Sequence, residues 1–221
     1  MAKRSASSAK TSTRQWWALA ALCLLAFGVG ALMRQAGPVG TDIGGRIDLA
    51  PLLGDRASPS SGPADAPVTL VVFTDYQCPA CRAAHPAMLR AGQSAGDVRI
   101  VYRDLPVLGP VSEQAARVAL ATRGQGLYAQ VHDAFMREPR WLTPAVMREI
   151  VTGLGGDWSE VEDALDGDRE IGRQLARNRT DALRLGVEGT PAYLIGSYRI
   201  IGALDEGGFA KAFEQARRAG G

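Results

Sequence analysis

The sequence predicts an α/β domain that contains an inserted helical subdomain and is preceded by one N-terminal transmembrane helix. Three observations support this fold class. Residues 68–102 follow a strand–helix–strand order, residues from about 112 to 185 are mostly helical, and two short strands follow that block. A crossover between parallel strands needs only a dozen or more residues, so a much longer helical block is better explained as an inserted subdomain.

The first part of the domain reads as a βαβ unit. Val68–Phe73 is a nearly continuous apolar run of strand length, which is typical of a strand covered on both faces. A helical stretch follows up to Arg90, with Pro79 in its first turn, and we expect Pro86 to kink or break this helix. Residues 98–102 form the second strand, which we expect to lie parallel to the first.

Helix and turn signals divide the rest of the domain. Thr143-Pro144 fits an N-cap followed by a first turn, and Ser159–Glu162 fits a capping box. Two short strands at 192–195 and 198–201 flank Gly196-Ser197, which predicts a hairpin. A final helix is predicted over residues 208–219.

The N-terminus carries a membrane signal. Residues 16–33 contain no charge and are near the lower length limit for a helix that spans a bilayer. Basic residues precede this run, so the positive-inside rule places residues 1–15 in the cytoplasm and the domain in the periplasm or extracytoplasmic space. A cleaved signal peptide is the alternative, and it also exports the domain. Residues 34–63 are rich in Gly, Pro, Ser and Asp and predict a flexible linker to a domain spanning 64–221.

The charge distribution excludes one class of partner. Five of the 25 basic residues and none of the 23 acidic residues lie within residues 1–34. The remainder of the chain is therefore slightly acidic, and it has no basic excess that would indicate a nucleic-acid partner.

Cys78 and Cys81 are the residues with the clearest chemical role. They stand two residues apart where a strand leads into a helix, whereas Cys23 lies in the apolar run and is interpreted as a small apolar residue. A helix N-terminus offers unpaired N–H groups and the positive end of the dipole, so we expect the Cys78 thiolate to be favoured. Cys81 is placed to form a disulfide with Cys78 and to release a substrate from a mixed disulfide. Both are predicted to be catalytic in thiol–disulfide exchange.

Other uses of the cysteine pair compete with this prediction. A structural staple closing a four-residue loop stabilises by only about 2 kcal/mol. A structural zinc site needs four ligands, and the domain adds only His85 and His132 as nitrogen ligands. A dithiol Cu(I) module needs only two thiolates and stays open, as does a scaffold or holdase that uses the helical subdomain.

With these residues in place, the chain resembles the DsbA-like branch of the thioredoxin superfamily. The resemblance covers residues 64–219 and is carried by two segments, APVTLVVFTDYQCPACRAAHPAM (66–88) and GVEGTPAYL (186–194). It implies a thioredoxin-like fold with the helical insertion, and no cofactor. It also implies that Pro191 is a cis-proline opposite the cysteines, and that Thr190 and Pro191 bind an extended substrate peptide as an added strand.

The resemblance leaves proton transfer and the direction of electron flow open. Many superfamily members carry a buried carboxylate six residues before the first cysteine, where this chain has Val72. His85 is a candidate for proton transfer to or from Cys81, with packing near the core as the alternative, and we expect Asp75 to cap or turn the backbone. His132 and the tryptophans, including Trp141, are interpreted as structural or interfacial.

The predicted activity is that of an oxidase for exported proteins, recycled by a membrane redox partner. Strong oxidants of the family carry Pro-His between the cysteines, but this chain has Pro-Ala. A reductase or isomerase kept reduced by a membrane partner is therefore the alternative.

Overall fold

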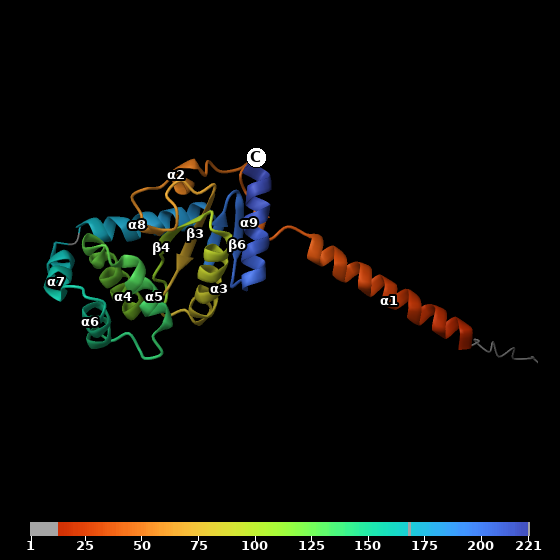
Figure 1. Cartoon of the computed structure of the whole chain (residues 1–221), viewed down its shortest axis with the longest axis horizontal. Coiled ribbons are helices and arrows are strands. Elements are labelled where there is room, and N and C mark those ends of the chain that lie inside the picture. The colour runs from red at the N-terminus through yellow and green to blue at the C-terminus, as the bar shows by residue number, and fades with distance from the viewer. Residues whose placement is uncertain (1–12, 168, 221) are drawn as a thin grey trace, which may run out of the picture. The chain divides into compact units, whose positions relative to one another are not determined.

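The computed structural model describes residues 13–167 and 169–220 (Figure 1). The chain divides into two compact units, Met1–Pro38 and Val39–Gly221. The first contains helix α1 (Thr13–Ala36), whose large apolar side chains between residues 16 and 27 are exposed. Among the described residues, no helix has the combined length and apolarity needed to cross a membrane. The transmembrane span predicted over residues 16–33 stays a prediction. Of the cytoplasmic tail predicted over residues 1–15, residues 1–12 lie outside the part of the chain that the structure describes.

A single mixed sheet forms the centre of the second unit, in the order β1-β6-β5-β3-β4-β2. Its strands are β1 (Thr41–Asp42), β2 (Ser60–Ser61), β3 (Val68–Thr74), β4 (Val98–Asp104), β5 (Ala192–Ile195) and β6 (Tyr198–Ile201). β3 and β4 are parallel, whereas β3 pairs with β5, and β5 with β6, in antiparallel fashion. The predicted βαβ unit and the predicted hairpin are both confirmed.

Successive side chains of β3 and β4 point to opposite faces of the sheet and pack into two separate hydrophobic cores. Val72 and Tyr102 face the side covered by α3 (Pro79–Ala95) and α9 (Glu206–Gly220), which pack against each other (Figure 1). Phe73 and Val101 face the opposite side, which α2 (Ala50–Leu53) and α8 (Arg169–Arg184) cover. Both faces of the sheet are therefore buried, as the continuous apolar pattern of the first strand predicts.

The predicted helical insertion is present between β4 and β5. It contains α4 (Pro110–Ala121), the short 3₁₀ helix η1 (Thr122–Gln125), α5 (Tyr128–Arg137), α6 (Pro144–Gly153), α7 (Trp158–Asp166) and α8. Thr143 caps α6 as expected, because its side chain accepts the Val146 N–H. The expected capping box at Ser159 is replaced by an earlier cap, in which the Asp157 carboxylate accepts the Ser159 N–H at 2.8 Å.

Helix α3 runs through Pro86 without interruption, so the predicted break is wrong. A proline inside a helix removes one hydrogen bond and adds a steric conflict, at a cost of about 3 kcal/mol. Packing compensates for this cost, because α3 contacts β4, α5 and α9 and buries six of its side chains together with Gly92.

The segment expected to be a flexible linker is part of the domain from residue 39 onward. Its β1 pairs with β6 and its β2 pairs with β4, so it supplies both outer strands of the sheet. Ile43, Leu49 and Leu52 are buried against the α8 side. Asp55 forms an ion pair with the buried Arg103 at 2.7 Å. The predicted linker boundaries of 34–63 are corrected accordingly.

Candidate active site

Cys78 occupies the N-cap position of α3. Its Sγ accepts a hydrogen bond from the Cys81 N–H at 3.4 Å, as the position before a helix predicts. Both cysteines are free thiols, with 7% of Cys78 and 2% of Cys81 exposed. Cys78 is therefore the more accessible sulfur of the pair.

The peptide bond between Thr190 and Pro191 is cis, as the family resemblance implies. The Cys78 thiol donates a hydrogen bond to the Thr190 carbonyl at 3.3 Å. The Pro191 carbonyl accepts the Gly202 N–H at 2.9 Å, which fixes this loop to the end of β6. The fold thus brings together two motifs that lie 112 positions apart in the sequence.

Cys81 is the more deeply buried thiol of the pair. Burial raises its pKa to about 12, although hydrogen bonds from the Asp75 backbone and the Thr190 and Thr74 side chains oppose this shift. Cys81 is therefore protonated at neutral pH. Exchange through Cys81 requires that its proton leave before its sulfur attacks.

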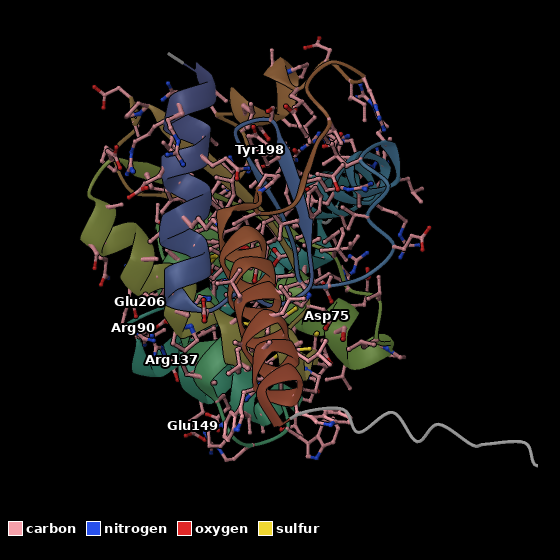
Figure 2. All side chains as sticks on the ribbon, turned by 90° about the vertical axis from the view of Figure 1, so that its right-hand side faces the viewer. Asp75, Arg90, Arg137, Glu149, Tyr198 and Glu206 are labelled. Carbon is pink, nitrogen blue, oxygen red and sulfur yellow. The ribbon has the colours of Figure 1, made fainter. Side chains whose placement is uncertain are left out.

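Asp75 fixes the corner between β3 and α3 and ties it to the next loop. Its buried carboxylate (Figure 2) accepts the N–H groups of Gln77, Val107 and Leu108 at 2.7–3.0 Å. It also accepts the Ser112 hydroxyl at 2.6 Å. The expected role of Asp75 in turning the backbone is confirmed, and the carboxylate also positions the loop between β4 and α4.

His85 lies on the buried side of α3, where its Nε2 is 2.9 Å from Asp133 Oδ1 on α5. Burial lowers the pKa of His85, and the Asp133 carboxylate partly offsets this shift. Its ring also packs against that of His132, with centroids 5.2 Å apart. Within the described part of the chain, the His85 imidazole forms no hydrogen bond with the Cys81 thiol, and its role in proton transfer stays a prediction.

A buried polar cluster that the sequence analysis missed lies next to this site. Tyr128 donates a hydrogen bond to the Asp104 carboxylate at 2.9 Å, and the Tyr76 hydroxyl is 2.8 Å from His132 Nδ1. Burial raises the pKa of Asp104 to about 7, against the opposing effect of the Tyr128 and Tyr76 hydroxyls. Burial also holds the pKa of His132 well below its ordinary range. Both groups therefore favour their neutral forms.

Strand register places Asp104 close to the cysteines. In the parallel pairing of β3 and β4, Asp104 is opposite Thr74, whose side chain hydrogen-bonds Cys81. The chain therefore does have a buried carboxylate near its active cysteines, one strand away from Val72. The sequence could have revealed this carboxylate, because side chains two residues apart on a strand point to the same face and Asp104 lies two residues after the buried Tyr102.

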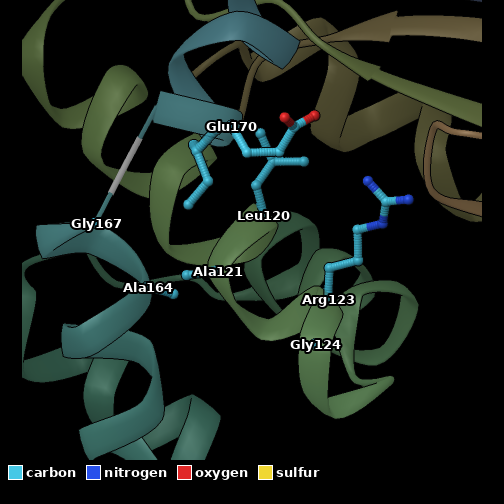
Figure 3. Close-up of a pocket in the computed structure, with 8 residues that line it drawn as sticks. Leu120, Ala121, Arg123, Gly124, Ala164, Gly167 and Glu170 are labelled. Atoms are coloured by element: carbon cyan, nitrogen blue, oxygen red, sulfur yellow. The ribbon is translucent and has the colours of Figure 1, made fainter.

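Other candidate sites offer less chemistry. Among the described residues, no group of three or more His, Cys, Asp and Glu side chains is arranged to hold a metal ion. A cavity of about 390 Å³ lies between the end of α4 and the start of α8 (Figure 3). Its lining residues are Leu120, Ala121, Arg123, Gly124, Ala164, Gly167, Glu170 and Ile171. None of these carries a thiol or a hydroxyl group, and the Glu170 carboxylate is paired with Arg173 and Arg177, so the cysteine pair remains the candidate active site.

Comparison with known proteins agrees with this geometry. The family model of the DSBA-like thioredoxin domain matches residues 69–214, which include both cysteines and the cis-proline. The chain belongs to this family. Its DSBA-like fold resembles that of a thioredoxin-like oxidoreductase from Silicibacter pomeroyi DSS-3, with 30% identity and a TM-score of 0.74. That comparison covers 78% of this chain and 99% of the other.

Further relatives belong to two kinds of protein. The thiol-disulfide exchange protein alpha-DsbA2 from Wolbachia pipientis is 28% identical with a TM-score of 0.71, over 76% of this chain and 91% of that one. The Na(+)/H(+) antiporter NhaA 3 of Salinispora tropica is 31% identical over 157 residues, or 70% of this chain. This DSBA-like chain spans only about a quarter of the length of the curated antiporters that it matches.

Proposed function

We propose that the protein is a thiol–disulfide oxidoreductase that exchanges disulfides with exported proteins through Cys78 and Cys81. The observation that carries this proposal is the meeting of Cys78 Sγ with the Cys81 N–H and the Thr190 carbonyl at 3.4 and 3.3 Å. Cys78 is then the sulfur that bonds to the substrate. Cys81 leaves Cys78 when a substrate is oxidised, and it attacks the mixed disulfide when a substrate is reduced. Thr190 and Pro191 hold the substrate backbone as an added strand.

In the oxidising direction, the resting enzyme carries a Cys78–Cys81 disulfide. A substrate thiolate attacks Cys78 Sγ, the bond to Cys81 breaks, and the Cys81 sulfur leaves with the electron pair and takes up a proton. A second substrate thiolate then attacks the substrate sulfur of the mixed disulfide and releases Cys78 as a thiolate. The substrate gains one disulfide and the enzyme becomes a dithiol. Reduction of a substrate follows the same steps in reverse.

We infer that oxidation is the working direction. The Cys81 N–H donates to Cys78 Sγ, and such a bond stabilises an ionised sulfur more than a sulfur in a disulfide. Stabilising the dithiol makes the disulfide a better oxidant. The reduction potential of the pair tests this inference: a value near −120 mV supports an oxidase, and one near −270 mV supports a reductase.

Export and membrane attachment form part of the proposal. The exposed apolar side chains of α1, including Trp16, Trp17 and Phe27, support attachment through this helix. The domain then lies outside the cytoplasm, where a membrane redox partner recycles the cysteines. Protease added to spheroplasts should digest the domain, and alkaline extraction should leave the chain in the membrane fraction. A protease-protected or freely extracted chain contradicts this placement.

The exchange chemistry is tested by single cysteine variants. Cys78→Ser should abolish exchange with a model dithiol. In Cys81→Ser the Cys78 thiolate can still attack a disulfide-bonded substrate and release one substrate thiolate, and the mixed disulfide should accumulate because no Cys81 thiolate attacks it. Cys23→Ser is the matched control and should exchange at the wild-type rate. Full activity of the Cys78→Ser protein would refute the proposed function.

A further inference from the structure

A cavity of about 330 Å³ is lined in part by Gln77 and Pro79, the residues on either side of Cys78 in the chain. One half of its lining is Gln77, Pro79 and Arg82, around the first turn of α3. The other half is Pro139, Arg140 and Trp141, in the loop between α5 and α6. Gln77 and Pro79 are the two chain neighbours of Cys78, so a polypeptide joined to this sulfur has the cavity within reach of its nearby side chains.

The loop that carries Trp141 is held in place from both ends. The Arg82 guanidinium donates hydrogen bonds to the carbonyl oxygens of Phe135 and Glu138, where α5 ends. The Trp141 carbonyl accepts the Thr143 N–H at 2.8 Å. Trp141 nevertheless leaves 75% of its surface exposed. A rigidly displayed indole can bury a large apolar area against a partner at little cost in conformational entropy.

Charge on the rim of the cavity is largely balanced. The Arg140 guanidinium lies 2.8 Å from the Glu138 carboxylate and 3.0 Å from that of Glu149. Two carboxylates thus surround this guanidinium, and Arg82 directs its donors at backbone carbonyls. The rim therefore gives a charged side chain little to pair with, and the exposed surfaces of Trp141 and the two prolines favour an uncharged, apolar one.

We propose that this cavity, the Trp141 pocket, binds a bulky apolar or aromatic side chain within about three residues of the substrate cysteine, a reach of roughly 10 Å along an extended chain. The inference rests on the proposed function of Cys78. Backbone pairing at Thr190 does not distinguish side chains, so the Trp141 pocket supplies the discrimination. The preferred substrate is an unfolded exported chain whose core aromatic residues still lie exposed near its cysteines.

The experiment measures reaction of the oxidised, full-length protein with short single-cysteine peptides. Each peptide carries either Phe or Ser at one of the three positions on each side of the cysteine. The rate of mixed-disulfide formation is divided by the rate with dithiothreitol, which has no side chain to place in the pocket. We expect the wild-type protein to prefer Phe over Ser about tenfold at one or more positions.

Three variants locate this preference. Trp141→Ala should reduce the Phe-to-Ser ratio to near one, and Trp141→Phe should retain most of it. Trp158→Ala is the matched control, because Trp158 lies on α7 and its ring contacts Arg148 instead of the pocket. It should preserve the wild-type ratio.

The outcomes separate the pocket from the proposed function. A wild-type protein that reacts with no thiol refutes the exchange function itself. A protein that reacts but shows no preference, or a preference that Trp141→Ala leaves intact, refutes only the Trp141 pocket. The same holds if Trp141→Ala changes self-association in sedimentation while the ratio stays at its wild-type value, because the surface then contacts a second copy of the chain.

Discussion

Asp104→Asn should make the protein more stable at pH 8 while changing its stability little near pH 4. Burial raises the pKa of Asp104 from an ordinary value of about 3.9 to about 7. As the pH rises through this window, the unfolded chain loses the proton while the folded protein retains it, so the free energy of unfolding falls. A difference of about 3 pKa units corresponds to about 4 kcal/mol above pH 7. Asparagine carries no charge, so it removes this penalty while its carbonyl can still accept the Tyr128 hydroxyl.

Urea denaturation at several pH values between 4 and 9 measures this effect. The cysteines are kept reduced in both proteins, because a disulfide would add its own contribution to stability. The difference between variant and wild type should be small at pH 4, grow between pH 4 and 7, and reach a plateau of about 4 kcal/mol. Asp97→Asn is the control, since Asp97 is paired with Arg217 at the surface. Parallel stability curves for Asp104→Asn and the wild type would refute the argument.

Three further predictions concern the site and its support. Asp75→Ala removes four accepted hydrogen bonds and should destabilise the domain by about 3 kcal/mol. The rate of amide hydrogen exchange should rise most in residues 106–112, and unchanged exchange there contradicts the role given to this carboxylate. Asp55→Ala leaves the buried Arg103 with Asp181 at 3.5 Å as its remaining ion-pair partner, beside a hydrogen bond to Asn178 at 3.1 Å. This change should cost about 3 kcal/mol in urea denaturation, whereas a neutral effect would show that residues 39–63 contribute little. The Cys81 pKa of about 12 predicts that the rate at which Cys81 attacks a mixed disulfide at Cys78 rises about tenfold per pH unit from pH 7 to 10. Stopped-flow kinetics measure this rate, and a plateau near pH 8.5 would contradict the prediction.

Local sequence patterns predicted the elements that hold the cysteines. β3, α3 and β4 follow from one apolar run, one CxxC and a second apolar run, and the strands at 192–195 and 198–201 have the bounds that were predicted. The cis state of Pro191 followed from the resemblance, because a single proline before a strand carries no signal of its own.

Features that depend on distant contacts were beyond the sequence. The strand period puts Asp104 on the same face as Tyr102, but its partner Tyr128 comes from α5 in the helical insertion, and that contact has no signal in the sequence. The continuity of α3 through Pro86 depends on packing against α5 and α9, which a helix pattern does not reveal. Residues 39–63 form two-residue strands and a single helical turn, which are too short to show any periodicity.

The two short outer strands β1 and β2 lie at the two edges of the sheet. A sheet border with free N–H and C=O groups is a template on which other chains can assemble. Here a single segment, residues 39–63, covers part of both edges of the sheet, because its β1 pairs with β6 and its β2 pairs with β4. Trimming the protein to residue 64, the boundary that composition suggests, would uncover both at once and invite aggregation. The leading stretch therefore belongs to any soluble form of this domain.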